Sequence, residues 1–398
     1  MTLHIGFAYR PITPSLDRPV YLAGFGQNRT AQSIHDDLYV RALALELGDT
    51  RLVLAALDLL GLSRHHYMEI ARRVNERSPG TRLILACTHT HHGPDTIGLW
   101  GPDETTPGVD GHYLADLKEK VAETIAAAQG QLRPAHLRSV SVLAPGLAKN
   151  ARDAHILDDE LTCLQFCEPG TGAALATILI FPCHPEVLWE HNPHITSDYA
   201  ASLRQQVEGE TGAPCLFFVG ALGGMLTPDV RDHSFEEAET MGTILAEAAL
   251  RALAGAQAAP VETLEQACRE YSIPMSSPLL EMALEAGLLP KTLTAQGMIG
   301  AEANLVKVGP AWLAGVPGEL LPKLGLALKA DLRQAGAAVA AIIGLANDEL
   351  GYILPEEDYL YPENPFEPGA HYEETMSVGP EAGPRLMGAM DALLGRDT

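Results

Sequence analysis

The sequence of 398 residues predicts an α/β fold, with a mixed, largely parallel sheet flanked by helices. Two patterns predict this class. Short apolar runs without polar alternation, typical of strands covered on both faces, recur along the chain. Segments with the apolar spacing of amphipathic helices lie between these runs. No Ser/Gly tract, Pro-rich spacer or charge block separates two halves, so we expect a single domain over residues 1–398.

The expected buried strands are six apolar runs with few polar residues. They are 52–57, 83–87, 176–181, 216–219, 311–316 and 339–345. Two further regions, 137–147 and 161–180, have the pattern of paired strands, which makes the sheet mixed. The clearest helix is 113–129, where Leu114, Leu117, Val121 and Ile125 form one stripe. Similar spacing predicts helices at 67–77, 199–208, 235–253, 320–334 and 384–394.

The net charge of -24 limits the kinds of partner. A strongly acidic surface repels phosphate backbones and anionic lipid, which excludes nucleic acid and membrane surfaces as expected partners. No apolar run reaches the ~18 residues needed to span a bilayer, so we expect no membrane insertion. A small-molecule substrate is the expected partner, and the pattern leaves a homo-oligomer open.

Cysteine usage and the N-terminal residues favour a cytoplasmic location. The start of the chain has neither the basic region nor the apolar region of a secretory signal. The chain has six cysteines and no CxxC pair, which argues against a thiolate zinc cluster. Most of them lie in or beside apolar runs, where a cysteine behaves as a small buried hydrophobe.

Polar residues follow each apolar run. Asp58 follows the first run, and the second and third are followed by THTHHGP at 88–94 and PCHPE at 182–186. The last two runs lead to PGE at 317–319 and ANDELGY at 346–352. Because ligands bind beyond the carboxyl ends of strands in open α/β sheets, side chains far apart in sequence can converge there.

The histidines among these residues point to a metal site. His89 and His91 are two apart, so an extended segment puts both on one side and His92 on the other. Such a pair can present both imidazoles to one metal, or one imidazole to a metal and the other to a substrate. An equally good alternative is that both are loop histidines that only hydrogen-bond to the backbone. Taken singly, His184 and Glu319 are each better explained as structural residues. Their placement together with the other polar residues at strand ends favours a functional site. Zinc suits these ligands, and iron or manganese can bind the same set.

Five ordered blocks resemble the neutral, non-lysosomal ceramidase family. They are THTH at 88–91, CHP at 183–185 with TSDY at 196–199, PGE at 317–319, GLAN at 344–347 leading to GY at 351–352, and HYE at 371–373. Looser matches at 12–14 and 37–42 extend the resemblance over nearly the whole chain. The resemblance implies a zinc-dependent catalytic domain that hydrolyses an N-acyl amide bond.

The resemblance also implies particular roles for residues. The zinc ligands that it implies are His89, His184, Glu319 and Tyr352. The residues that it places at the reaction centre are His91, Arg152 and Tyr372. A tyrosine ligand fits the chemistry, because a phenol has a pKa near ~10 and a nearby dication favours the phenolate. Without the resemblance, Tyr352 is read as a strand-edge aromatic and Tyr372 as a packing residue.

Three departures from the family bear on the substrate. Thr227 stands where the family has a serine before a proline, and its hydroxyl keeps it as a catalytic candidate. Ceramidases carry a C-terminal immunoglobulin-like domain, whereas this chain ends soon after the Tyr372 block. They are secreted or membrane-displayed, and this chain shows no signal. A shorter, more soluble amide or ester is therefore as good a candidate as ceramide.

Three hypotheses describe the function. The first is amide hydrolysis by metal-activated water, with His91 as proton shuttle and Tyr372 or Arg152 stabilising the oxyanion. The second is a zinc-dependent esterase or lactonase acting on a small soluble substrate. The third is a small-molecule binding protein without catalysis, for which the Thr227 region is the best support.

Overall fold

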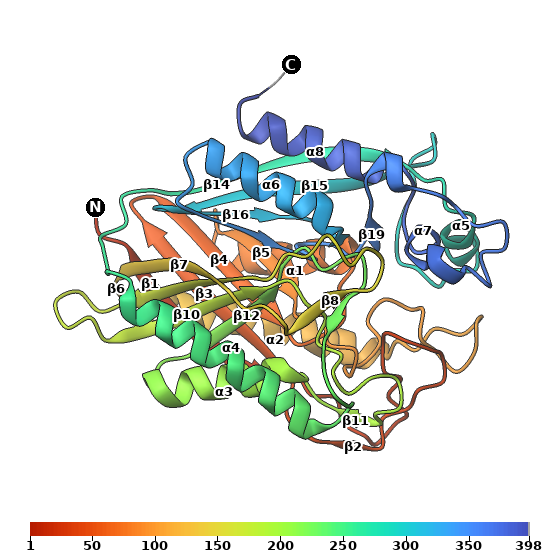
Figure 1. The fold of residues 1–398 in the computed structure, drawn as a ribbon, viewed down its shortest axis with the longest axis horizontal. Coiled ribbons are helices and arrows are strands. Elements are labelled where there is room, and N and C mark those ends of the chain that lie inside the picture. The colour runs from red at the N-terminus through yellow and green to blue at the C-terminus, as the bar shows by residue number, and fades with distance from the viewer. Residues whose placement is uncertain (397–398) are drawn as a thin grey trace.

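Three four-stranded units of β-sheet form the centre of the protein, with helices on the outside (Figure 1). The computed structural model describes residues 1–396. Each unit has the same succession of elements: an edge strand, an antiparallel hairpin, a crossover helix, a strand parallel to the second hairpin strand, and an outer helix. The chain therefore contains one structural repeat three times, although no short sequence repeat reveals it.

The elements of the three repeats are as follows in chain order. The first consists of β1 (His4–Pro11), β3 (Tyr39–Leu47), β4 (Thr50–Leu57), α1 (Arg64–Arg77), β5 (Arg82–Cys87) and α2 (Gly111–Gln129). The second consists of β7 (His136–Leu143), β9 (Glu160–Cys167), β10 (Ala174–Phe181), α3 (Tyr199–Thr211), β12 (Cys215–Val219) and α4 (Phe235–Gly255). The third consists of β14 (Leu264–Pro274), β15 (Met298–Val308), β16 (Ala311–Gly315), α6 (Pro322–Gln334), β18 (Val339–Ile343) and α8 (Ala382–Leu393).

Shorter elements lie between the first two repeats and in the loops within each repeat. β6 (Arg133–Pro134) extends the first sheet beside β1, and three short pairs form separately. These pairs are β2 (Ser33–Ile34) with β11 (His194–Ile195), β8 (Ala148–Asn150) with β13 (Leu226–Pro228), and β17 (Glu319–Leu320) with β19 (Tyr352–Ile353). The remaining helices are α5 (Pro278–Glu285), η1 (Glu356–Asp358), η2 (Gly369–His371) and α7 (Tyr372–Thr375). α5 and α7 lie together at the right of Figure 1.

The predicted elements are present, but the prediction of a largely parallel sheet is wrong. All six predicted strands and all six predicted helices occur, with ends shifted by a few residues. Within each repeat, two strand pairs are antiparallel and only the pair joined by the crossover helix is parallel. The reason is connection length: two residues join β3 to β4 and β15 to β16, which suffices for a hairpin, whereas a parallel pair requires a crossover.

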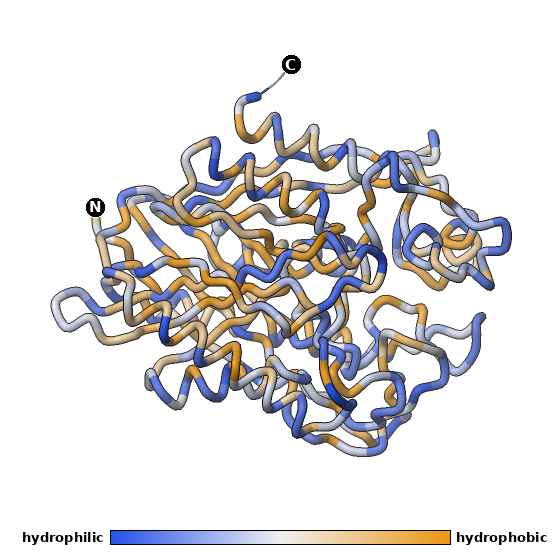
Figure 2. The backbone as a smooth tube through the Cα atoms, viewed as in Figure 1, coloured by the Kyte–Doolittle hydropathy of each residue, from blue (hydrophilic) through white to orange (hydrophobic). Residues whose placement is uncertain are grey.

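The continuous apolar runs arise because both faces of every sheet are covered. Inner-face residues of all three sheets, such as Leu54, Ile178 and Leu313, belong to one central cluster. Helices cover the outer faces, with α1 and α2 on the first sheet, α3 and α4 on the second, and α6 and α8 on the third. Figure 2 shows this hydrophobic centre in orange. Burial on both faces therefore does not depend on strand direction.

Within the described residues, no helix combines the length and the apolar composition needed to cross a bilayer.

Gly6 marks the closest contact of the first sheet with its helix. A Cβ atom at Gly6 would lie 2.0 Å from the backbone oxygen of Ala128, next to the end of α2. We expect Gly6→Ala to lower the free energy of unfolding by about 1–3 kcal/mol, because neither backbone can yield freely. Gly300→Ala is the control, since a Cβ there meets no atom within 4 Å. Urea denaturation of both variants measures this, and equal stabilities would contradict it.

Candidate metal centre

The candidate ligands come from loops that follow strands of all three repeats. His89 follows β5, and His184 follows β10. Glu319 and Tyr352 begin β17 and β19, which follow β16 and β18 and pair in parallel with Glu319 opposite Tyr352. Three distant stretches of sequence thus meet at one end of the sheets. The structure brings together the four residues that the sequence analysis associates with zinc.

The ligand atoms face one another. The Oε2 atom of Glu319 lies 3.1 Å from Nε2 of His184 and 3.6 Å from Nε2 of His89. His91 also lies near this group, because one ring nitrogen from each of His89, His91 and His184 lies within 4.8 Å of the others. All four side chains are buried. Distances of this size are those of a donor set that surrounds a single cation.

Two backbone carbonyls fix the orientation of the imidazoles. Nδ1 of His89 donates to the oxygen of Leu60, and Nδ1 of His184 donates to the oxygen of Leu226, each at 2.8 Å. With Nδ1 engaged in this way, Nε2 is the nitrogen of each ring that faces Glu319. Metal-binding histidines are typically held by such a bond from the second nitrogen, so this arrangement fits a bound cation.

The backbone at His89 adopts the left-handed conformation, with φ at 63°. For a residue other than glycine this conformation costs about 1–3 kcal/mol, and it persists only where surrounding contacts hold it. Here the His89 amide donates to the Leu59 oxygen at 2.9 Å, beside the ring's bond to Leu60. The backbone is therefore strained at His89, whose ring must be oriented so that Nε2 faces Glu319.

Charges near the candidate ligands shift their protonation. Burial lowers the pKa of His184, but the carboxylates of Glu186 and Glu319 outweigh burial and raise that pKa to about 9. Burial raises the pKa of Glu319, yet the imidazoles of His89 and His184 hold it below its usual value. The carboxylate is thus ionised and acts as an acceptor between two imidazoles. An ionised oxygen in this place favours a cation over a neutral ligand.

Tyr352 lies beside this donor set with a weakly engaged hydroxyl. Its hydroxyl donates to the sulfur of Met225 at 3.3 Å, and a thioether is a poor acceptor. Burial raises the pKa of Tyr352 well above its usual value, and the Glu319 charge adds to this effect. The ring contacts Tyr372 edge to face at 6.0 Å between centroids. Both phenols line the same cavity.

His91 faces a carboxylate that the sequence analysis did not single out. Oε2 of Glu186 lies 3.3 Å from Nδ1 of His91, and Glu186 is fully buried. On the other side the ring packs on Gly24, where a Cβ would lie 2.5 Å from Nδ1, and on the edge of Phe25 at 4.8 Å. Burial lowers the pKa of His91 well below its usual value, with the neighbouring imidazoles adding to the shift. The lowered pKa favours a neutral imidazole, and neither ring nitrogen has a hydrogen-bond partner in the described part of the chain.

Thr227 and Arg152 lie outside the lining of this cavity. Thr227 is in β13; burial raises the pKa of the nearby Glu186, and the Thr227 hydroxyl offsets only part of that effect. Arg152 is engaged by two acids of α7: it pairs with Glu373, and its Nη2 donates to Oε1 of Glu374 at 2.8 Å. Arg152 thus holds the short helix that begins with Tyr372 rather than pointing into the cavity.

A buried ion pair between Asp58 and Arg204 holds the loop that carries His89. Both guanidinium nitrogens of Arg204 donate to Asp58, at 2.7 and 2.9 Å, and both side chains are almost fully buried. Asp58 also accepts from the backbone of Tyr39 and from the hydroxyl of Thr88. Because Thr88 precedes His89, this pair connects α3 of the second repeat to the histidine loop of the first.

Three of the candidate ligands, His89, Glu319 and Tyr352, line a cavity of about 450 Å³, and His184 lies next to Glu319 outside this lining. Apolar side chains form much of the remaining lining, including Ile97, Trp100, Met275, Leu280 and Leu289. The apolar segment 275–300, for which the sequence favours core packing over a lid or a subunit contact, packs in the third repeat and also contributes to the wall of this cavity. The size and the lining suit a small organic molecule.

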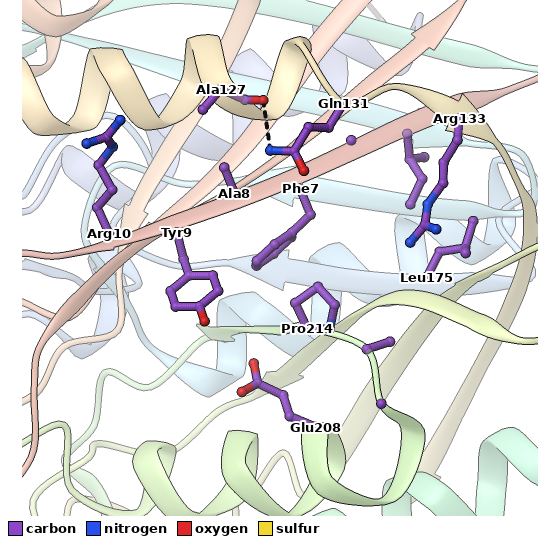
Figure 3. A pocket seen from close by; sticks show the side chains of 14 residues that line it. Phe7, Ala8, Tyr9, Arg10, Ala127, Gln131, Arg133, Leu175, Glu208 and Pro214 are labelled. Carbon is purple, nitrogen blue, oxygen red and sulfur yellow. Dashed lines mark hydrogen bonds between the residues drawn. The ribbon is translucent and has the colours of Figure 1, made fainter.

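A larger hollow of about 960 Å³ lies elsewhere, along the outer edge of β1. Figure 3 shows Tyr9 of β1 facing Glu208 and Pro214 across it. None of the candidate ligands lines this hollow, so volume alone does not identify the site.

Two solved structures share this architecture. The crystal structure of neutral ceramidase from Pseudomonas aeruginosa matches with a TM-score of 0.80 and 18% sequence identity, covering 100% of this chain and 75% of that chain. The chain has the fold of neutral ceramidase. A structure described as ceramidase complexed with C2 matches at a TM-score of 0.80 and 17% identity, covering 99% of this chain and 75% of the other. Neither a protein-family model nor a curated protein matches the sequence.

The neutral ceramidase fold confirms the resemblance found in the sequence. At this identity the likeness shows the fold and leaves the activity to be argued from the site. The sequence analysis missed Glu186 and Lys291 as cavity residues. Glu186 is only two residues past His184 in the PCHPE block, and this spacing was the available signal. Nothing in the local pattern around Lys291 indicated that it would reach the cavity.

The Asp58–Arg204 pair gives a stability prediction. We expect Arg204→Met to lower the free energy of unfolding by about 3–5 kcal/mol, because it leaves the buried Asp58 carboxylate without its cation. Arg251→Met, on an exposed position of α4, is the matched control and is expected to change stability by less than about 0.5 kcal/mol. Chemical denaturation measures both, and a loss below 1 kcal/mol for Arg204→Met would show that Asp58 needs no partner.

Proposed function

We propose that this protein is a metal-dependent hydrolase that cleaves an amide bond of a small molecule. The observation that carries the proposal is the convergence of the Nε2 atoms of His89 and His184 on the carboxylate of Glu319, at the wall of a cavity. The neutral ceramidase fold supports an amide as the target bond.

His89, His184, Glu319 and Tyr352 are the proposed ligands, and zinc is the proposed ion. Two imidazoles, a carboxylate and a phenol are nitrogen and oxygen donors of the kind zinc accepts. A bound divalent cation would polarise a carbonyl and lower the pKa of water to near ~7. The ring orientations set by Leu60 and Leu226 present the imidazole lone pairs without further rearrangement.

His91 is the proposed proton shuttle. Because its pKa is lowered by burial, the ring is neutral and can accept a proton from the attacking water. Glu186 faces Nδ1, which leaves Nε2 as the nitrogen that takes the proton and delivers it to the leaving amine. A proton on Nδ1 would face the Glu186 carboxylate at 3.3 Å, which would favour this tautomer of the ring.

Tyr372 is the proposed donor to the oxyanion. It lines the cavity beside Tyr352 and begins α7, whose acids are held by Arg152. Burial raises the pKa of Tyr372 above the usual value of a phenol, so the hydroxyl stays protonated at neutral pH and can donate a hydrogen bond as charge develops on the carbonyl oxygen. Arg152 then acts by placing Tyr372 rather than by touching the substrate.

Metal content and turnover test the ligand set. We expect His89→Ala and His184→Ala to lose bound metal and to lose hydrolysis of a panel of short N-acyl amides and matching esters. His191→Ala, whose side chain is exposed, is the control and should keep both. Elemental analysis beside the rate assays measures this. Undiminished turnover by metal-free protein would refute the proposal.

The same assays separate a shuttle from a third imidazole ligand at His91. A shuttle predicts that His91→Ala keeps its metal and ester turnover but loses amide turnover, because an alkoxide needs less protonation than an amine. Loss of the metal in His91→Ala would instead assign His91 to the ligand set.

Glu186→Gln tests the orienting role of that carboxylate. We expect kcat to fall by about 10- to 100-fold with little change in KM or metal content, because an amide no longer fixes the tautomer of His91. Glu210→Gln, on the exposed side of α3, is the matched control. Steady-state kinetics with one amide substrate measures the effect; a rise in KM at constant kcat would mean that Glu186 binds substrate instead.

A further inference from the structure

The hollow along β1, remote from the candidate metal centre, contains a free edge of a β-sheet. β3 pairs with all of β1, from His4 to Pro11, whereas β6 pairs only with His4 and Ile5. Among the described residues, the outer edge of β1 therefore has no neighbouring strand beyond Ile5. Such an edge presents unused N–H and C=O groups to which a further strand can bond.

The register identifies the backbone groups that face the hollow. The amide of Ala135 donates to the oxygen of Leu3 at 2.8 Å, which places the backbone groups of Leu3 on the β6 side. Because successive residues of an antiparallel strand bond to opposite sides, the odd-numbered residues of β1 face away from β3. The N–H and C=O groups of Phe7 and Tyr9 thus point into the hollow.

The hollow has a wall on each side of this edge. The end of α2 forms one wall, and Glu208 with residues 212–214 forms the other. Figure 3 shows β1 between the two, with the rings of Phe7 and Tyr9 pointing toward the second wall. A single extended chain can enter between such walls, whereas the edge of a second folded sheet would meet them first. The shape therefore favours a peptide over a second copy of the protein.

The free part of β1 lacks the features that usually protect an edge strand. Natural proteins block such edges with charged residues, prolines or bulges. β14, the corresponding edge strand of the third repeat, carries Glu265, Arg269 and Glu270 at exposed positions. The segment Gly6–Tyr9, in contrast, has neither a charge nor a proline, and Tyr9 is 55% exposed. An exposed tyrosine beside free backbone groups is typical of an interface.

The charges around the hollow restrict the occupant. Arg10 and Arg133 line its two ends and are exposed. Arg10 has one exposed partner, Glu123 at 3.4 Å, and Arg133 forms no ion pair within residues 1–396. The acid in the lining, Glu208, is already paired with Arg41. Salt screens the acidic remainder of the surface beyond about 8–10 Å, so these local cations favour an acidic segment.

We propose that this hollow binds an extended segment of a partner protein, with an acidic side chain at each end, as an additional antiparallel strand on β1. Both neighbours of β1 are antiparallel to it, and the segment would continue the line of β6. Its residues opposite Phe7 and Tyr9 exchange backbone hydrogen bonds with them and place side chains against the two rings. About five residues, at about 3.4 Å each, cover the free edge from Gly6 to Arg10.

Peptides with single backbone changes test the pairing. The probe is Glu-Val-Ser-Val-Glu with a fluorophore on an N-terminal Gly-Gly spacer, and fluorescence anisotropy measures its dissociation constant. In the antiparallel register its first valine lies opposite Tyr9 and its serine opposite Ala8. We expect N-methylation of that valine to weaken binding at least about tenfold, because it removes the donor to the Tyr9 oxygen. N-methylation of the serine, whose N–H faces away from β1, is the matched control and should change binding less than about threefold.

Variants of the protein locate the binding. Arg10→Glu should weaken binding of the probe at least about fivefold and improve binding of a probe with lysine at both ends. Arg72→Glu, at an exposed position of α1, is the matched control and should leave both affinities unchanged. Tyr9→Ala should weaken both probes, because it removes the exposed ring. If Tyr9→Ala does not fold, the N-methyl pair on the wild-type protein decides.

Three results would overturn the proposal. The first is the absence of saturable binding of the probe up to about 1 mM. The second is an equal effect of the two N-methyl groups, which would mean that binding does not use the β1 edge. The third is a concentration-dependent dimer in light scattering that Arg10→Glu or Tyr9→Ala dissociates, which would assign the edge to a second copy of this chain.

Discussion

The buried carboxylate of Glu319 is the constraint on which the arrangement of the site depends. An ionised oxygen removed from water must be compensated by opposite charge or by hydrogen-bond donors. Two imidazoles from different repeats face it, and each is fixed by a backbone carbonyl on its far side. Hydrogen bonds to backbone carbonyls hold the rings of His89 and His184 in place. The Asp58–Arg204 pair holds the loop that carries His89, where the backbone has the left-handed conformation.

The threefold repeat explains how such distant residues meet. Each repeat ends its hairpin and its parallel strand on the same side, because a crossover helix returns the chain before the last strand begins. The loops after β5, β10, β16 and β18 therefore open toward one end of the structure. The cavity forms there between loops that lie within the three repeats, and these loops supply both charged and apolar side chains to its walls.

The sequence predicts the elements and the strand-end residues well, because burial on both faces and polar residues at the ends leave plain patterns. It does not predict strand direction, because an apolar run has the same composition whether its neighbour is parallel or antiparallel. Glu186 and Lys291 escape prediction for a different reason: their roles arise from residues that face them in space, His91 and Asp348, and not from local spacing. The engagement of Arg152 by Glu373 and Glu374 likewise depends on tertiary contacts.

The division of the ligands among the repeats has a thermodynamic consequence. The first repeat supplies His89, the second His184, and the third Glu319 and Tyr352, so no repeat alone offers a complete donor set. An ion bound by all three would stabilise only the fully docked arrangement, by an amount that grows with the ratio of its free concentration to its dissociation constant. Local opening of any one repeat would then release the ion, and three otherwise separable foldons would unfold as a single cooperative unit.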